Sequence, residues 1–511
     1  MAAQQNKPFW LDKFTLDTRS ASLFRIMLAL IALYDIIFYR IAGFNLFYST
    51  NGIVPPAYCY KQSPLAFLSP YFWFNNDGFS LGLLYFSVAV FVFYLLGIGL
   101  KFVKPLGWFL YLAILLRNLN VEFGYNIYTD HALFWALFIP MGNHFTVFGL
   151  RKNNPITEVK TADPLAVFAV ALQVALLYFT TAVAKYGEAW TKGIAVRNMV
   201  ADTTFDSPMQ NIILNSPPLY KLLTYGTLVA EYLIPILLIW SFFSKGNGPR
   251  YAAILLVYAL HIGILMFSDV GTFSYISITM ATLFLPPAFW EKLRTRIKQI
   301  PTIKFPPLQG GGLGRGLRYI LTASITAMVF MNLMFYVFHT PLKKSFLPKN
   351  GGRFLLDTRA FPLKELSPFG QHWGMYAPNP MSNIGWITIE YQKDSLQPMR
   401  SLFNDAVALP NKPVYTPPTL EKYFLYFVRT WYNKKNQHDM AVFWAKYHIA
   451  KFKAEKPEQA AGANIYVVNY IKLVTNQKSI KKLPFIKQIN TVEEFEHLFD
   501  NRGNTNQKVE E

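Results

Sequence analysis

Long apolar runs separated by short polar segments dominate the first part of the chain. A helix that crosses a bilayer needs about 20 mostly apolar residues. Nine segments meet this requirement and are predicted as membrane-spanning helices: 22–41, 79–100, 105–120, 131–148, 164–186, 220–243, 251–267, 273–289 and 319–338. Most connections between them are short, as is typical of helical bundles. The pattern therefore predicts an all-α polytopic membrane bundle of about nine transmembrane helices.

The pattern changes after residue 339, where the chain becomes polar and rich in Lys and Asn. Gly385–Gln392 and Asn464–Val474 alternate apolar and polar residues, which predicts strands. Ala441–Phe452 has the spacing of an amphipathic helix. We therefore expect three parts, namely a cytoplasmic N-terminal segment, a transmembrane domain and a small C-terminal α+β domain, at 1–21, 22–339 and 340–511.

Lysine and arginine residues in the loops predict the orientation. With the N-terminus in the cytoplasm, the loops on that side carry 17 basic residues and the opposite loops carry six. Loops rich in Lys and Arg stay in the cytoplasm. Nine crossings then place the C-terminal domain outside the cytoplasm. We expect a multi-pass membrane protein, in the inner membrane if the host is bacterial.

Composition supports the membrane environment and excludes other classes. Of 511 residues, 52% are hydrophobic and only 15% are charged, against about 25% charged in soluble domains. The net charge of +20 is assigned to loops and anionic lipid headgroups rather than to nucleic acid. The single cysteine, Cys59, excludes an internal disulfide and a Cys-based metal cluster, and we expect no metal site.

Ionisable residues inside the predicted spans are the candidates for chemistry, because each costs about 2.5–3.5 kcal/mol to insert. They are Arg25, Asp35, Arg117, Asp130, His131, Lys185, Glu231, His261 and Asp269. At a rise of about 1.5 Å per residue, Lys185, His131 and His261 fall in the outer half of the bundle, and Glu231 falls near mid-depth. We therefore predict one outer-leaflet pocket that contains Lys185 and both histidines.

A buried lysine loses the solvation of its charged form and can then act as a neutral base. Tyr178 and Thr181 share the helical face of Lys185 and are expected to line the pocket. This role requires that no carboxylate is paired with Lys185, and Glu188 is the expected rival. The alternative is a lysine that extends to the membrane surface.

The other candidates also have structural interpretations. His261 can be an interhelical hydrogen-bonding residue, and Asp35 a structural ion-pair partner. Glu231 can pair with Arg25 or Arg117, or satisfy backbone groups freed by a nearby proline. A transporter is not favoured, because inverted repeats are not evident.

Three segments resemble the vitamin K-dependent γ-glutamyl carboxylases. YFTTAVAKYGEAWTKG (Tyr178–Gly193) resembles their fifth-span motif, with Lys185 at the position of the catalytic base. LHIGILMFSDVGTFSYISITMATLFLP and TDHALFWALFIPM resemble two further spans, with His261 and His131 at the family's histidines. The N-terminal LFRIMLAL is typical of the wider group, the horizontally transferred transmembrane (HTTM) domain. The likeness covers about residues 15–340.

The resemblance implies a reaction and its residues. In the carboxylases the lysine deprotonates vitamin K hydroquinone, oxygen forms the epoxide, and CO2 adds to a glutamate of a peptide. The resemblance implies Lys185 as base, with His131 and His261 as catalytic hydrogen-bond partners, and the shared helical face places Tyr178 and Thr181 as the residues expected to bind the quinol.

The implied cofactor is reduced vitamin K or another membrane quinol, with O2 and CO2 as co-substrates. The implied partners are the lipid bilayer, a membrane quinone and a secreted peptide or protein. Here Ala184 replaces one of the paired lysines, so we expect quinol epoxidation coupled or not to glutamate carboxylation. The competing function is a non-catalytic membrane scaffold or peptide-maturation partner.

Overall fold

The computed structural model divides the chain into two compact units. The described residues are 13–147, 163–201, 207, 209–296, 376–380, 384–393, 400–403, 421, 424–425, 428, 435–463, 465–474 and 479–489. The first unit comprises Met1–Ile41, Cys59–Ala201 and Phe205–Pro380, and the second comprises Ala42–Tyr58, Asp202–Thr204 and Met381–Glu511. The predicted domain boundary at residue 340 and the predicted span 319–338 lie outside the described residues.

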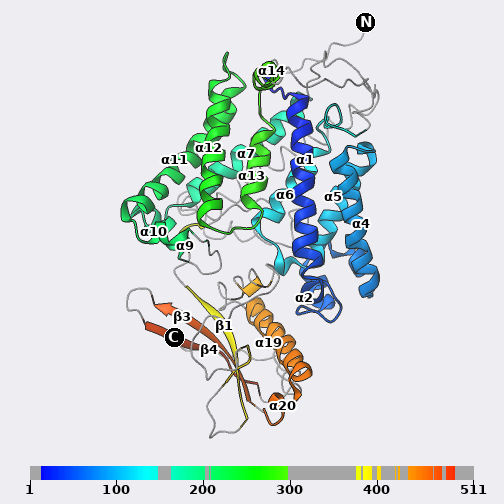
Figure 1. Cartoon of the computed structure of the whole chain (residues 1–511), viewed down its shortest axis with the longest axis vertical. Helices are drawn as coiled ribbons and strands as arrows, with labels where there is room; N and C mark the ends of the chain where they lie inside the picture. Colours follow the sequence, from blue (N-terminus) through cyan, green and yellow to red (C-terminus); the bar gives the residue numbers. More distant parts are fainter. Residues whose placement is uncertain are drawn as a thin grey trace, which may run out of the picture. The chain divides into compact units, whose positions relative to one another are not determined.

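Helices account for most of the described chain up to residue 296 (Figure 1). In chain order they are α1 (Thr18–Tyr34), the π-helical η2 (Asp35–Ile41), α2 (Phe44–Phe47), α3 (Pro56–Gln62), η3 (Ala66–Leu68), η4 (Pro70–Phe72), α4 (Asp77–Leu96), α5 (Leu100–Arg117), η5 (Leu119–Val121), α6 (Gly124–Ala136), α7 (Pro164–Ala184), α8 (Glu188–Thr191), α9 (Ala195–Val200), α10 (Gln210–Leu214), α11 (Pro217–Ser241), α12 (Gly248–Phe267), α13 (Phe273–Thr282) and α14 (Pro287–Arg296).

Five helices in the described part of the chain are long and apolar enough to cross a membrane. They are Thr18–Ile41, Asp77–Leu96, Pro164–Ala184, Pro217–Trp240 and Gly248–Phe267. These helices confirm the predicted segments 22–41, 79–100, 164–186, 220–243 and 251–267 as apolar helices. The pair α13 and α14, bent by 86°, brings the number to six if it counts as one span. Nine spans are not confirmed, and the orientation stays a prediction.

The predicted span 131–148 is wrong as a helix. The helix α6 begins earlier, at Gly124, and ends at Ala136. Lys104 lies at this end, and its ammonium group donates to the carbonyl oxygens of Ala136, Leu137 and Ile139 at 2.9–3.0 Å. The last carbonyls of a helix have no partner within the helix, and the partly buried Lys104 satisfies the carbonyl of Ala136 and two carbonyls just beyond the helix.

Two other predicted spans also differ from the structure. Segment 105–120 overlaps α5, which runs from Leu100 to Arg117 and includes Lys101, Lys104 and Arg117. Because of these charges, α5 is not among the five helices that are apolar enough to cross a membrane. Segment 273–289 is broken after Thr282. The break coincides with consecutive prolines, Pro286 and Pro287, which cannot continue a helix.

The helices of the first unit pack mainly through neighbouring pairs. α7 lies against α11, α11 against α12, and α12 against α13, while α13 also contacts α6 and α1. On the other side, α1 packs on α4 and α4 on α5. Figure 1 shows α11 and α12 on one side of the helical unit, α4 and α5 on the other, and α1, α7 and α13 between them. This arrangement encloses the polar residues of α6, α7, α11 and α12.

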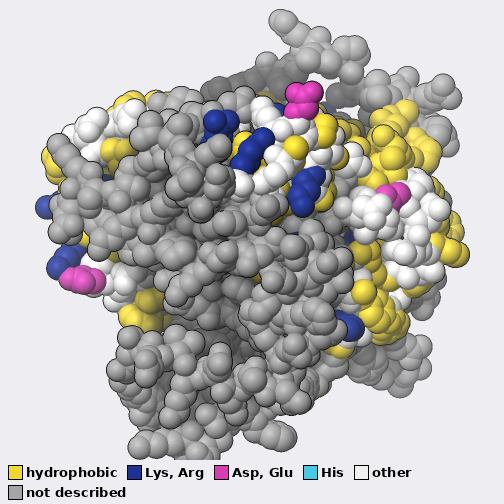
Figure 2. Space-filling model, turned by 90° about the horizontal axis from the view of Figure 1, so that it is seen from below, with side chains coloured by type: hydrophobic (Ala, Val, Ile, Leu, Met, Phe, Trp, Pro, Cys, Tyr) yellow, Lys and Arg dark blue, Asp and Glu magenta, His cyan; other side chains and the backbone are white. Residues whose placement is uncertain are grey.

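The outward faces of several helices are apolar. Leu222 on α11 and Leu255 on α12 are 68% and 67% exposed, and Tyr85 on α4 is 56% exposed. Figure 2 shows hydrophobic side chains gathered along the margin on which α4 and α5 lie in Figure 1. Exposed apolar surfaces of this kind are stable in contact with hydrocarbon rather than water, so these faces are assigned to the lipid.

The second unit contains a four-stranded antiparallel sheet of order β2-β1-β3-β4. Its elements are β1 (Ile384–Gln392), β2 (Arg400–Ser401), α19 (Lys435–Glu455), α20 (Pro457–Ala460), β3 (Ile465–Val474) and β4 (Ser479–Ile489). The structure confirms the strands predicted at Gly385–Gln392 and Asn464–Val474, and the predicted helix Ala441–Phe452 lies within α19. The strand β4 was not predicted. That this unit lies outside the cytoplasm stays a prediction.

Candidate functional site

Lys185 lies directly after the last turn of α7. The helix starts with Asp163 as N-cap and Pro164 in its first turn, and Lys185 is its C-cap residue. The chain then turns through Gly187, whose backbone N–H donates to the carbonyl of Pro378 at 3.0 Å. A Cβ at this glycine would lie 2.2 Å from Oδ1 of Asn379. Only glycine therefore allows the close approach of Pro378 and Asn379 to the chain at this turn.

The residues after Gly187 hold this connection in place. Asn379 accepts from the backbone N–H of Ala189 at 2.8 Å, and the indole N–H of Trp190 donates to the carbonyl of Tyr376 at 3.0 Å. Trp190 is almost fully buried. Its ring lies 4.9 Å from the Lys185 ammonium group, a distance at which an aromatic face stabilises a cation. The turn thus fixes both the lysine and an aromatic surface beside it.

The partner of Lys185 is Glu231, from the middle of α11. An ion pair joins Nζ of Lys185 to Oε1 of Glu231, and the side chains are only 4% and 8% exposed. The alternative that Lys185 extends to the surface is therefore wrong, and the condition set for a neutral base, that no carboxylate is paired with Lys185, is not met. The interpretation that Glu231 pairs with Arg25 or Arg117 is wrong, because its partner is Lys185. Glu188, the expected rival, is exposed and pairs with Lys192.

Only one oxygen of the Glu231 carboxylate is used. Among the described residues, no hydrogen-bond donor reaches Oε2, although this atom is buried. An unsatisfied buried acceptor costs roughly 1–3 kcal/mol, and more when the group is charged. A buried polar atom without a hydrogen-bond partner calls for an explanation. A ligand or a proton bound at Oε2 would provide one.

A second polar pair lies beside the first. A hydrogen bond of 2.9 Å joins the Tyr178 hydroxyl to Nε2 of His261, and Nδ1 of His261 lies 3.4 Å from the Ser274 hydroxyl. Tyr178 and His261 are both buried. His261 is close enough to Lys185, and Tyr178 to Glu231, to interact electrostatically. The structure therefore brings together α7, α11, α12 and α13 around one buried polar cluster.

The remaining predicted site residues are His131 and Thr181. His131 is buried on α6, three residues after Tyr128, whose ring centre lies 6.3 Å from that of Phe273. Phe273 in turn lies 5.4 Å from His261, so this face of α6 reaches the edge of the cluster. Thr181 donates its hydroxyl hydrogen to the carbonyl of Leu177 at 2.7 Å. The roles of His131 and Thr181 stay predictions.

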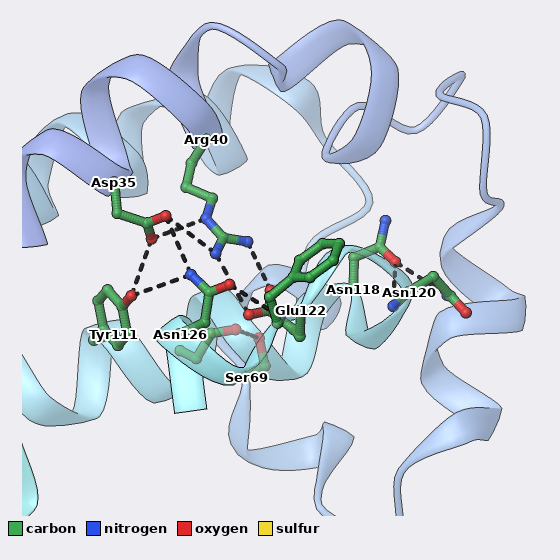
Figure 3. A network of polar contacts seen from close by, with 10 residues as sticks. Asp35, Arg40, Ser69, Tyr111, Asn118, Asn120, Glu122 and Asn126 are labelled. Carbon is green, nitrogen blue, oxygen red and sulfur yellow. Dashed lines mark hydrogen bonds and ion pairs between the residues drawn. The ribbon is translucent and has the colours of Figure 1, made fainter. Parts of the chain in front are cut away.

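A separate polar network lies between η2, α5 and α6 (Figure 3). The Asp35 carboxylate accepts from Arg40 at 3.0 Å, from the Tyr111 hydroxyl at 3.1 Å and from the Asn126 amide at 3.2 Å. Arg40 also pairs with Glu122 at 2.6 Å. Burial disfavours the charged form of Glu122, in the loop before α6, and raises its pKa to about 8 although the Arg40 guanidinium opposes this shift. The prediction that Asp35 is a structural ion-pair partner is confirmed.

The sequence indicated that Glu231 is unusual but not that it belongs to the site. α7 and α11 pack side by side, and α7 ends beside the middle of α11 rather than beside its end. Counting residues from the loops therefore placed the two charges at different depths. Trp190 was also missed as a site residue, because its role depends on the turn at Gly187. Within the described residues, no group of three or more His, Cys, Asp or Glu side chains could hold a metal ion.

Apolar outward faces and buried polar clusters between long helices define a multi-pass membrane protein. The sequence model of the HTTM domain matches residues 15–290, more than half of the chain. The chain therefore belongs to the HTTM domain family. No curated protein and no solved structure is significantly similar to it.

Proposed function

We propose that this chain carries out oxygen-dependent epoxidation of a reduced membrane quinone, coupled or not to carboxylation of glutamate in a peptide. The observation that carries the proposal is the buried Lys185–Glu231 pair beside the buried Tyr178–His261 pair. Ionisable residues inside a membrane bundle are functional-site candidates by default. The resemblance of the segments around Lys185 and His261 to the vitamin K-dependent carboxylases suggests the reaction.

The chemistry of these residues fits a hydroquinone head group. An aromatic diol needs polar partners for its hydroxyl groups and an apolar surface for its ring. Oε2 of Glu231 is an unused acceptor, Tyr178 and His261 offer polar atoms, and Trp190 and Phe273 offer aromatic surfaces. A bound reduced quinone supplies an ionisable hydroxyl group and the electrons for reaction with oxygen.

The protein groups then have separate tasks. Lys185, at the position of the base, is paired with Glu231 and is therefore not a free neutral amine; we propose that the pair together takes up the hydroxyl proton, a contribution of about 10²–10⁴ in rate. Its positive charge stabilises the oxygen anion that remains, and electrostatic stabilisation is strongest where water is excluded. The Tyr178–His261 pair orients a second oxygen. His131 is proposed as a further hydrogen-bond partner, in keeping with the resemblance.

The test uses the full chain in lipid nanodiscs, supplied with a reduced naphthoquinone and oxygen. Epoxide measured by mass spectrometry is the expected product. The matched control is the double variant Lys185→Met, Glu231→Gln, because it removes both charges and leaves neither one buried without its partner. Wild-type protein that makes no more epoxide than this variant would rule out the proposed activity. Labelled CO2 and a glutamate-containing peptide then report carboxylation.

A non-catalytic scaffold remains the competing function, and the same variant separates the two. A scaffold that needs only a folded bundle keeps its peptide-maturation or binding role in the double variant. A buried ion pair does little for stability compared with apolar residues of the same size. The presence of a buried Lys185–Glu231 pair is therefore easier to explain by chemistry than by packing.

A further inference from the structure

Two features of the site favour the charged form of Lys185. The carboxylate of Glu231 is paired with its ammonium group, and the face of Trp190 lies 4.9 Å away. Both interactions stabilise a cation. A lysine held in this way has no free lone pair, so it accepts a proton only if it passes one of its own protons to another group.

Glu231 is the group that can receive this proton. Its Oε1 is already in contact with Nζ of Lys185, and its Oε2 is buried with no donor among the residues that the structure describes. Donors stabilise the charged form of a carboxylate, and burial without donors disfavours it. The Asp35 carboxylate, by comparison, accepts from three different side chains. The Glu231 carboxylate is therefore stabilised by fewer hydrogen-bond donors than the Asp35 carboxylate.

We infer that Glu231 is the final proton acceptor of the site and that Lys185 relays the proton and remains as a fixed cation beside the substrate oxygen. The inference rests on the proposed function, which supplies the hydroxyl group. The hydroxyl O–H bond breaks and its electron pair stays on the oxygen. An N–H bond forms at Nζ of Lys185 while another N–H proton moves to Glu231, which becomes a neutral carboxylic acid.

Charge balance supports this sequence of events. Before the transfer, the Lys185–Glu231 pair is neutral overall, and so is the hydroxyl group. Afterwards the pair carries one positive charge and lies next to one negative oxygen. Opposite charges created in contact cost far less in a low-dielectric interior than separated charges. No oxidant or reductant takes part in this step.

Infrared difference spectroscopy tests the inference directly. The wild-type protein and the variant Glu231→Gln are mixed with a reduced naphthoquinone in the absence of oxygen. We expect a new band of a protonated carboxylic acid in the wild type and none in the variant. The control is Glu188→Gln, which removes a carboxylate that is also paired with a lysine but is exposed; this variant should keep the band.

Turnover provides the second measurement. Glu231→Gln should lower epoxide formation by about 100-fold or more, while Glu231→Asp should restore part of the rate. A Glu231→Gln protein within tenfold of the wild-type rate, or a wild-type protein that binds the quinol without the new band, overturns the inference. If the wild type forms the band but no epoxide, the inference stands and the proposed function fails.

Discussion

Two of the buried ion-pair clusters in the described part of the bundle, around Arg40 and around Lys185, differ in how completely their hydrogen bonds are used. Around Arg40, the Asp35 carboxylate accepts from three side chains, and Glu122 provides a second carboxylate for the same guanidinium. Around Lys185, a single carboxylate uses one oxygen and leaves the other without a donor among the described residues.

The difference separates a structural cluster from a reactive one. A buried network in which most donors and acceptors are used is rigid and holds its elements together. A buried pair with an unused acceptor retains the capacity to bind a proton or a ligand. The two clusters contain similar residue types, so residue type alone does not tell which cluster performs chemistry.

The largest expected effect is on activity, at the Lys185 pair. Lys185→Met should lower quinol epoxidation by about 10²–10⁴-fold, as loss of a general base does. Because this change leaves Glu231 buried without a cation, the double variant with Glu231→Gln serves as the folded reference. Thermal unfolding in nanodiscs should show the double variant close to the wild type, and epoxide formation should show both variants inactive. Full activity of either variant would end the assignment.

The next effect is on stability, at the Arg40 network. Arg40→Ala leaves two buried carboxylates without their cation, and removal of one partner of a buried pair costs about 3–5 kcal/mol. We expect a marked fall in the thermal midpoint and in the amount of inserted protein. If Arg40→Ala lowers stability no more than the Lys185 double variant does, the distinction between the two clusters is wrong.

A smaller loss is expected at the turn that positions Lys185. In Gly187→Ala the new methyl group would meet Asn379 and the carbonyl of Pro378. Steric overlap of this kind costs about 1–3 kcal/mol and should also reduce turnover, since Trp190 and Lys185 are displaced. The control is Gly226→Ala, where a methyl group meets no atom within 4 Å. That variant should be neutral or slightly more stable, because alanine favours the helix.

The Tyr178–His261 pair should give an effect of about tenfold. Tyr178→Phe removes one hydrogen bond, which contributes about 0.5–1.5 kcal/mol. The matched control is Tyr258→Phe, which removes a 2.7 Å hydrogen bond to Thr282 from the same bundle. Both variants should lose similar thermal stability, but only Tyr178→Phe should change kcat or KM for the quinol. If the two variants have the same kcat and KM for the quinol, the Tyr178 hydroxyl contributes only to the stability of the bundle.

The pH dependence of stability should show the smallest effect. Because the pKa of Glu122 is about 8 in the folded protein and about 4.3 in an unfolded chain, the folded state binds more protons between these values. Stability should therefore fall as pH rises from about 5 to about 8. Glu122→Gln keeps an acceptor for Arg40 and should flatten this slope, measured as thermal midpoint against pH. An unchanged slope would mean that Glu122 is already ionised in the fold.

The sequence alone determined the membrane class, the five long apolar helices and two strands of the second unit. These features depend on local patterns: apolar runs of sufficient length, and alternation with a period of two. The sequence also identified Lys185, His261 and Tyr178 as candidates, since charged and polar residues are conspicuous in apolar helices. The helix predicted at 131–148 was wrong: α6 ends at Ala136, where Lys104 from another helix donates to the carbonyls of Ala136 and Leu137, a contact that a local pattern does not reveal.

Only the tertiary structure decided which charges meet. The sequence offered Glu188 as the carboxylate nearest to Lys185, but the packing of α7 against α11 pairs Lys185 with Glu231. Residues 376–380 then fix Trp190 and the turn at Gly187 from a distant part of the chain. Helix periodicity determines which residues share a face, whereas the relative depth and rotation of two helices depend on side-chain packing between them. For that reason the sequence identified the residues of the site, but it did not show that Lys185 pairs with Glu231.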